Sequence, residues 1–200
     1  MAKVWDVAKN ALVLFLITAV VAALLAGANL LTKDKIAQNS ASAEQEALKE
    51  VIAAQRFERT DGLVLLELPE VVATAYVALD GNEVVGYCFK VTPTGYGGTI
   101  EVVYGVDTSL AITGVSILSH GETAGLGANI VKEEFRNQFK GKTAVVGAAK
   151  SAPKADEIQA LSGATISSKA IARGADTALS AAAFLNNFSA EELIVKEAAK

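Results

Sequence analysis

The sequence predicts an α+β fold, an antiparallel sheet with flanking helices, preceded by one N-terminal transmembrane helix. Three observations lead to this prediction: an apolar run over residues 11–31, two pairs of strand-like segments between residues 71 and 119, and an alanine-rich helical pattern over residues 166–186. Strands that follow one another, with helices between and after them, are typical of α+β domains.

The apolar run is long enough to cross a membrane. No charged residue lies between Lys9 and Lys33, and a helix that rises about 1.5 Å per residue crosses a hydrocarbon core of about 30 Å with some 20 residues. The run is apolar on all sides, whereas a helix on the surface of a soluble core carries an apolar stripe. Residues 26–28 resemble the cleavage site of a signal peptide, but the apolar run continues through Leu30 and Leu31. We therefore expect a retained anchor.

The charges beside the anchor are nearly balanced, so the positive-inside rule gives little preference for either orientation. The short leading segment and its free amine favour a cytoplasmic N-terminus. We therefore expect a single-pass protein of the cell (inner) membrane with an extracytoplasmic C-terminal domain.

The remaining elements follow from local patterns. Residues 38–55 predict an amphipathic helix whose apolar face carries Leu48, Val51 and Ile52, with Ser40 or Ser42 as its cap. Two hairpins are expected, because each pair of strand-like runs encloses a short polar turn. The expected strands and helices of the rest of the domain are strands 71–79, 84–92, 98–106, 111–119 and 143–148 and helices 130–139 and 166–186.

Composition excludes several classes of function. The net charge is −4 and no basic stripe is present, which argues against nucleic acid as a partner. The single cysteine, Cys88, excludes an intrachain disulfide framework and an iron–sulfur cluster ligated by this chain alone. It lies in a strand-like run, where we expect a buried structural thiol. The single histidine, His120, cannot hold a metal alone, and we expect no metal site.

The most informative segment is residues 162–168, which open the long C-terminal helix. The first N–H groups of a helix lack partners within the helix, and the helix dipole favours an anion beside them. Ser162, Gly163 and Ala164 leave room for a bulky group to approach the backbone, and Thr165 presents a hydroxyl there. These residues therefore predict a phosphate site. Simple capping of the helix remains the alternative, since capping needs only a hydroxyl.

Two glycine-rich loops precede this segment. Residues 119–127 contain three glycines beside His, Glu and Thr, a composition able to wrap a flat ring and offer hydrogen-bond donors. Residues 92–100 form a second glycine-rich bend, in which Tyr96 either contacts a ligand or packs within the domain. Neither loop has the spacing of a Walker or Rossmann motif, which argues against nucleotide hydrolysis and NAD binding.

All three segments resemble signatures of the FMN-binding domain family. Residues 162–168 resemble its flavinylation motif Ser-Gly-Ala-Thr-x-[Thr/Ser]-Ser, and residues 120–127 resemble its His-x-Glu-Thr-x-Gly-Leu-Gly signature, with Ala124 where the family often has proline. The resemblance implies that Thr165 carries FMN covalently through a phosphoester bond made by a separate flavin transferase. The other residues that it implies at the cofactor are Ser162, Gly163, Ala164 and Ser167 near the phosphate, and Glu122, Thr123, Gly125, Leu126 and Tyr96 near the ring.

With its anchor, the chain resembles the G subunit of the Rnf electron-transport complex and is similar to the C subunit of the Na⁺-translocating NADH:quinone reductase. The resemblance implies an electron-relay subunit of an ion-translocating ferredoxin:NAD⁺ oxidoreductase, an enzyme whose other membrane and peripheral subunits are the partners. No acid, base or nucleophile of this chain is needed, because the cofactor performs the redox chemistry. The alternatives are a stand-alone membrane-anchored flavoprotein, a quinone reductase subunit, and a domain without redox function.

These expectations divide the chain into four parts: a membrane anchor (1–35), a connecting amphipathic helix and entry to the domain (36–70), the FMN-binding domain (71–188) and a charged tail (189–200).

Overall fold

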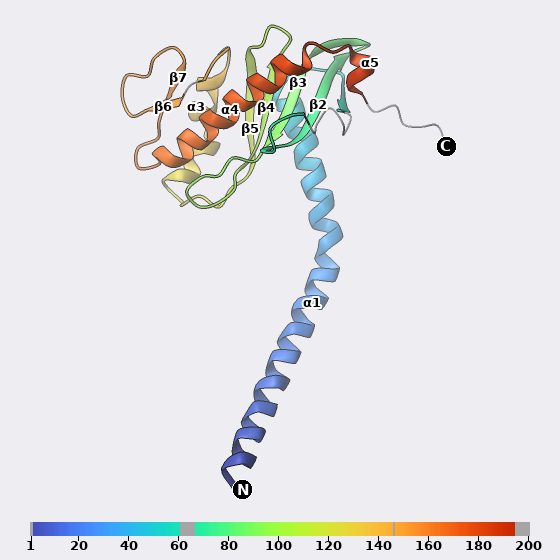
Figure 1. Cartoon of the computed structure of the whole chain (residues 1–200), viewed down its shortest axis with the longest axis vertical. Coiled ribbons are helices and arrows are strands. Elements are labelled where there is room, and N and C mark those ends of the chain that lie inside the picture. The colour runs from blue at the N-terminus through green and yellow to red at the C-terminus, as the bar shows by residue number, and fades with distance from the viewer. Residues whose placement is uncertain (1, 61–66, 146, 195–200) are drawn as a thin grey trace, which may run out of the picture. The chain divides into compact units, whose positions relative to one another are not determined.

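The computed structural model describes residues 2–60, 67–145 and 147–194. The chain divides into two compact units, residues 1–43 and 44–200. Their internal structure confirms the predicted α+β class: an apolar N-terminal helix, then an antiparallel sheet with helices (Figure 1).

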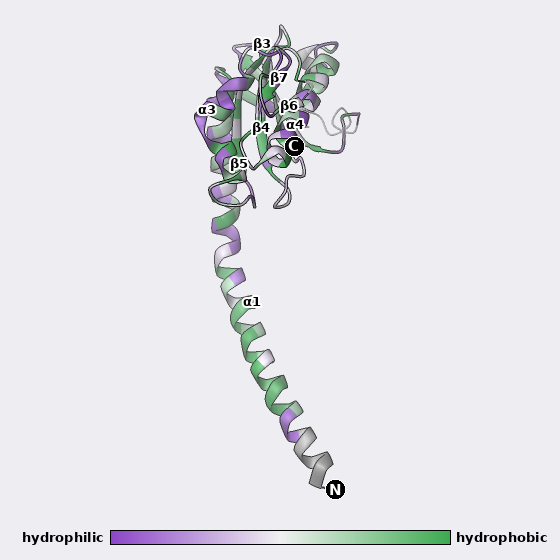
Figure 2. Cartoon of the chain, turned by 90° about the vertical axis from the view of Figure 1, so that its left-hand side faces the viewer, coloured by the Kyte–Doolittle hydropathy of each residue, from purple (hydrophilic) through white to green (hydrophobic). Residues whose placement is uncertain are grey.

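The first unit consists of one helix, which belongs to α1 (Ala2–Val51). Its apolar part is the broad green band of Figure 2, and an 18-residue window there has a mean hydropathy of 2.7 and no buried residue. Length and composition therefore suit a membrane crossing. The separate helix start expected near residue 38 was wrong, since Ser40 and Ser42 lie inside α1. Residues 32–39, which join the apolar run to the expected second helix, contain neither proline nor glycine, so the helix continues through them. At the start of this stretch, the Thr32 hydroxyl donates to the Ala28 carbonyl of the same helix (2.9 Å).

The second unit is built on a five-stranded antiparallel sheet in which each strand pairs with its sequence neighbours. The strands are β1 (Arg56–Arg59), β2 (Val72–Asp80), β3 (Glu83–Val91), β4 (Glu101–Asp107) and β5 (Ile112–Ser119). Both predicted hairpins, β2–β3 and β4–β5, are confirmed. Strand β1 was not expected from the sequence, because its four residues show too little alternation of apolar and polar side chains to indicate a strand.

Helix α4 (Thr165–Leu185) covers one face of the sheet (Figure 1). The expected helix is confirmed, and the side chains that it packs against the sheet are all buried: Ile171, Ala175, Ala178, Leu179, Ala182 and Leu185. Gly174 lies where any Cβ atom would come within 2.5 Å of the Tyr104 hydroxyl oxygen. That hydroxyl is buried and donates to the Ile171 carbonyl (2.8 Å), so a glycine in mid-helix allows a buried tyrosine to pack against the helix backbone.

The last turns of α1, from Glu44 onward, cover the opposite face. The predicted apolar face of Leu48, Val51 and Ile52 is confirmed, because these side chains are buried in a cluster that also contains Cys88. Burial raises the pKa of the Cys88 thiol, which agrees with the expected structural role. The Thr113 hydroxyl donates to the Val51 carbonyl (2.5 Å) and so satisfies a free acceptor at the helix end.

The segment after β5 differs from the expected single helix over residues 130–139. It forms η1 (Gly127–Val131), α3 (Glu133–Arg136) and η2 (Asn137–Phe139). Extended backbone at Lys132 (φ −66°, ψ 139°) separates the first two pieces. Phe135 and Phe139 are buried, whereas Val131 is 44% exposed.

The expected strand over residues 143–148 was also misplaced. The structure has β6 (Gly147–Ala149), which pairs in parallel with β7 (Glu157–Gln159). The chain continues after α4 into α5 (Ala190–Leu193), and half of the expected charged tail, residues 195–200, lies outside the described residues.

Candidate functional site

A cavity of about 780 Å³ lies where the two glycine-rich loops meet the start of α4. Cofactor pockets have volumes of roughly 300–1,000 Å³. Of the ten residues predicted at the cofactor, those that line the cavity are Tyr96, Glu122, Thr123, Leu126, Ser162, Gly163, Ala164, Thr165 and Ser167. The tenth, Gly125, does not line it. Its positive φ of 77° turns the loop beside Leu126, and its carbonyl accepts a hydrogen bond from the Asn129 side chain (2.9 Å).

The start of α4 is open to a ligand. Its N-cap residue is Ala164, and no side chain caps the helix. Gly163 reaches this turn with φ of 73°, a conformation that glycine adopts without strain. Thr165, the first residue of the helix, is half-buried and lines the cavity. The helix start therefore offers N–H groups and one hydroxyl to an anion, as the phosphate prediction requires.

The buried Ser168 side chain stabilises the turn that precedes α4. Its hydroxyl donates to the Ala164 carbonyl (2.9 Å) and accepts from the Leu161 N–H (3.0 Å). Ser168 is fully buried, so the hydroxyl that stabilises the turn points away from solvent and leaves the helix start uncapped.

Glu122 joins the three segments. Its Oε1 atom accepts the N–H of Gly97 (3.0 Å), and its Oε2 atom accepts the hydroxyl of Ser167 (2.6 Å). The Glu122 N–H donates to Nδ1 of His120 (3.2 Å), which gives the histidine a role in the loop. The Ser167 side chain was predicted to lie near a phosphate. In the structure its hydroxyl group donates its hydrogen to Glu122 instead.

Apolar side chains border the same cavity. Tyr96 is 72% exposed, Leu126 45% and Ile166 52%, and all three line the cavity. A Cβ atom at Gly163 would lie 3.0 Å from Cδ2 of Leu126, so the glycine lets the loop and the helix start approach closely. These exposed apolar groups form a surface suited to a flat aromatic ring.

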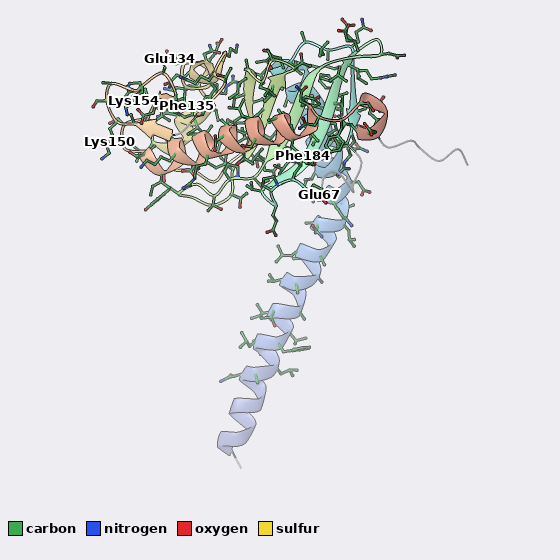
Figure 3. All side chains as sticks on the ribbon, turned by 45° about the horizontal axis from the view of Figure 1, so that its top comes forward. Glu67, Glu134, Phe135, Lys150, Lys154 and Phe184 are labelled. Carbon is green, nitrogen blue, oxygen red and sulfur yellow. The ribbon has the colours of Figure 1, made fainter. Side chains whose placement is uncertain are left out.

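Sequence reasoning missed Lys150 and Gln159, which also line the cavity. Both lie near the β6–β7 pair, and the Gln159 side chain donates to the Lys150 carbonyl (2.5 Å). Figure 3 shows Lys150 beside the N-terminal end of α4 and Phe184 toward its other end. No local motif marks Lys150, because only the pairing of β6 with β7 brings it to the cavity. Lys169, one turn into α4, is exposed and does not line the cavity.

These groups fit FMN by their chemistry. The molecule combines a flat ring with a phosphate dianion. The cavity combines an apolar wall at Tyr96, Leu126 and Ile166 with an uncapped helix start and a lysine. The Thr165 hydroxyl belongs to the first residue of α4, at the uncapped start of the helix.

Comparison with known proteins supports the same interpretation. Residues 95–180 match the model of the FMN-binding domain, and residues 1–51 match that of the RnfG N-terminal region. The G subunit of the Na(+)-translocating ferredoxin:NAD(+) oxidoreductase complex of Acetobacterium woodii is 36% identical over 190 residues, which are 88% of this chain and 91% of that relative. The G subunit of the ion-translocating oxidoreductase complex of Methanosarcina acetivorans is 32% identical over 83% of this chain and 89% of that relative.

Among solved structures, the C subunit of the Na(+)-translocating NADH-quinone reductase of Parabacteroides distasonis is similar, with 29% identity over 58% of this chain and 63% of that chain and a TM-score of 0.48. The curated relatives extend over nearly the whole sequence, anchor included, and both family models match. The chain therefore belongs to the RnfG family.

Proposed function

We propose that this chain is the electron-relay subunit of a membrane-bound, ion-translocating ferredoxin:NAD⁺ oxidoreductase complex, and that it carries FMN in a phosphoester bond to Thr165. One observation carries the proposal: Thr165 stands at the uncapped start of α4, inside a cavity that also has an apolar wall for the ring. We infer the complex from the relatives, which are G subunits of such complexes by name.

The residues of this chain hold and orient the cofactor. The first N–H groups of α4 and the Lys150 ammonium stabilise the phosphate charge. Leu126, Tyr96 and Ile166 pack against the ring and exclude water from part of it. FMN supplies the electron-transfer chemistry when bound, so no side chain of the protein is required to act as an acid or base.

The membrane helix and the ester bond together keep the flavin at the membrane. The N-terminal helix crosses the membrane once with its N-terminus in the cytoplasm, and the flavin domain lies on the opposite side. Free FMN is scarce there, so a cofactor held by reversible binding would be lost. An ester bond removes the dissociation equilibrium. A separate flavin transferase makes that bond.

Intact-mass measurement tests the covalent bond. Protein purified from its own host should carry one FMN-sized mass increment, which maps to the peptide that contains Thr165. The denatured, acid-washed protein should stay yellow. Release of all flavin on denaturation would overturn the covalent bond, and a protein that never contains flavin would overturn the proposed function.

Purification in a mild detergent tests the assembly. We expect the chain to co-purify with several multi-span membrane proteins in constant proportion, because a relay subunit must lie within electron-transfer distance of its neighbours. A chain that carries FMN yet purifies alone under conditions that preserve other membrane complexes would instead favour a stand-alone flavoprotein.

A further inference from the structure

Glu122 is an acidic side chain buried in the wall of the cavity. It is 8% exposed, and its two carboxylate oxygens accept hydrogen bonds from the Gly97 N–H and the Ser167 hydroxyl. In the parts of the chain that the structure describes, none of the four ion pairs includes Glu122. Hydrogen bonds from two neutral donors hold the charge in place but do not neutralise it.

The surrounding glycines reserve space for this carboxylate. A Cβ atom at Gly95 would collide with Oε1 of Glu122. At Gly127 a Cβ atom would lie 2.5 Å from Oε2 of Glu122 and 2.8 Å from Oγ of Ser167. Neither glycine has the positive φ that would itself explain the absence of a side chain. Clearance around the Glu122 carboxylate is the requirement that these two positions share.

We infer that Glu122 is a redox-tuning residue, whose fixed negative charge in the cavity wall lowers the midpoint potential of the bound flavin. This inference rests on the proposed function. Reduction adds electrons to the flavin, and a nearby carboxylate disfavours added negative charge. The effect is strong where solvent screens poorly, and Glu122 is both buried and part of the cavity lining.

The hydrogen bonds of Glu122 allow its charge to be tested separately from its structural role. A glutamine at position 122 has nearly the same shape. Its amide oxygen accepts the Gly97 N–H, and its NH₂ group donates to the Ser167 oxygen once that hydroxyl rotates. The Glu122→Gln variant therefore removes the charge while it keeps the connection between the two loops and α4.

The test is a spectroelectrochemical titration of the full-length, detergent-solubilised flavoprotein. Relative to the wild type at the same applied potential, Glu122→Gln should shift the ratio of reduced to oxidised flavin about tenfold toward the reduced form, which is about 30 mV for a two-electron couple. The matched control is Glu134→Gln. It removes an equal charge from an exposed position on α3 that does not line the cavity, and should leave the ratio unchanged.

A glutamine variant with the wild-type ratio would overturn the inference, and so would equal shifts in both variants. A folded Glu122→Gln protein without FMN would also overturn it, because the carboxylate would then serve attachment. If that variant does not fold, Glu122→Asp keeps the charge and should retain the wild-type ratio, and a shift toward the reduced form would count against the inference. The absence of FMN from the wild type would instead contradict the proposed function.

Discussion

Replacement of Thr165 by valine should abolish covalent flavin attachment while the domain stays folded. Valine has nearly the same shape and the same branched Cβ atom, but it has no oxygen to form the ester. Thr165 is half-buried at the first position of α4 and does not belong to the core of the domain. We expect a stability change of no more than about 1 kcal/mol and complete loss of the FMN-sized increment in the intact mass.

Thr177→Val is the matched control for this experiment. Thr177 lies on the same helix, and its hydroxyl donates to the Arg173 carbonyl (3.0 Å), away from the cavity. The control should keep the full mass increment and the colour after denaturation. An FMN-sized increment that persists in Thr165→Val would show that another hydroxyl, such as that of Ser162, carries the ester.

The substitution Gly114→Ala should destabilise the domain by loosening the end of α1 from the sheet. A Cβ atom at Gly114 would lie 2.8 Å from Cα and 2.9 Å from the carbonyl oxygen of Val51. Both are backbone atoms and cannot rotate away, so the helix end must shift. We expect a loss of about 2 kcal/mol, within the usual range for overpacking. This corresponds to a fall in Tm of roughly 5 °C, measured by thermal unfolding of the detergent-solubilised chain.

Gly147→Ala provides the comparison. A Cβ atom at Gly147 meets nothing within 4 Å, and its backbone φ is not positive. Glycine within a strand costs about 0.5–1 kcal/mol relative to alanine, so this control should be neutral or slightly stabilising. If Gly114→Ala unfolds at the same temperature as Gly147→Ala, the close packing of Val51 against β5 does not contribute to stability.

The destabilisation caused by Gly114→Ala should also weaken the contacts that Arg136 makes with the end of α1 and with β5. Arg136 on α3 forms an ion pair with Glu50 (2.6 Å) and donates to the Val115 carbonyl (3.0 Å). The end of α1 is therefore tied both to the sheet and to the segment that follows the Glu122 loop. Hydrogen exchange in residues 127–139 should accelerate in Gly114→Ala, and unchanged exchange there would show that the two regions are independent.

Local sequence signals were sufficient wherever one element alone carried the pattern. The apolar run, the two hairpins and the long C-terminal helix follow from periodicity and turn residues, and the structure confirms them. The glycine-rich loops and the start of α4 were predicted as site segments from their composition and from the resemblance to the FMN-binding domain family, and nine of the ten residues named there line one cavity. Turns and helix starts require particular residues at fixed spacing, which makes them visible in a single sequence.

Only the tertiary structure decided which distant groups meet. β1 forms because β2 offers it an edge, and the β6–β7 pair brings Lys150 to the cavity although no motif marks it. Glu122 was expected beside the ring, but its hydrogen bonds to Gly97 and Ser167 depend on segments 25 and 45 residues away. The sequence by itself determined the apolar N-terminal helix, the fold class and the segments that line the cavity, since these depend on neighbouring residues. The charge environment of the cavity depends on long-range pairing and burial, which no local pattern encodes.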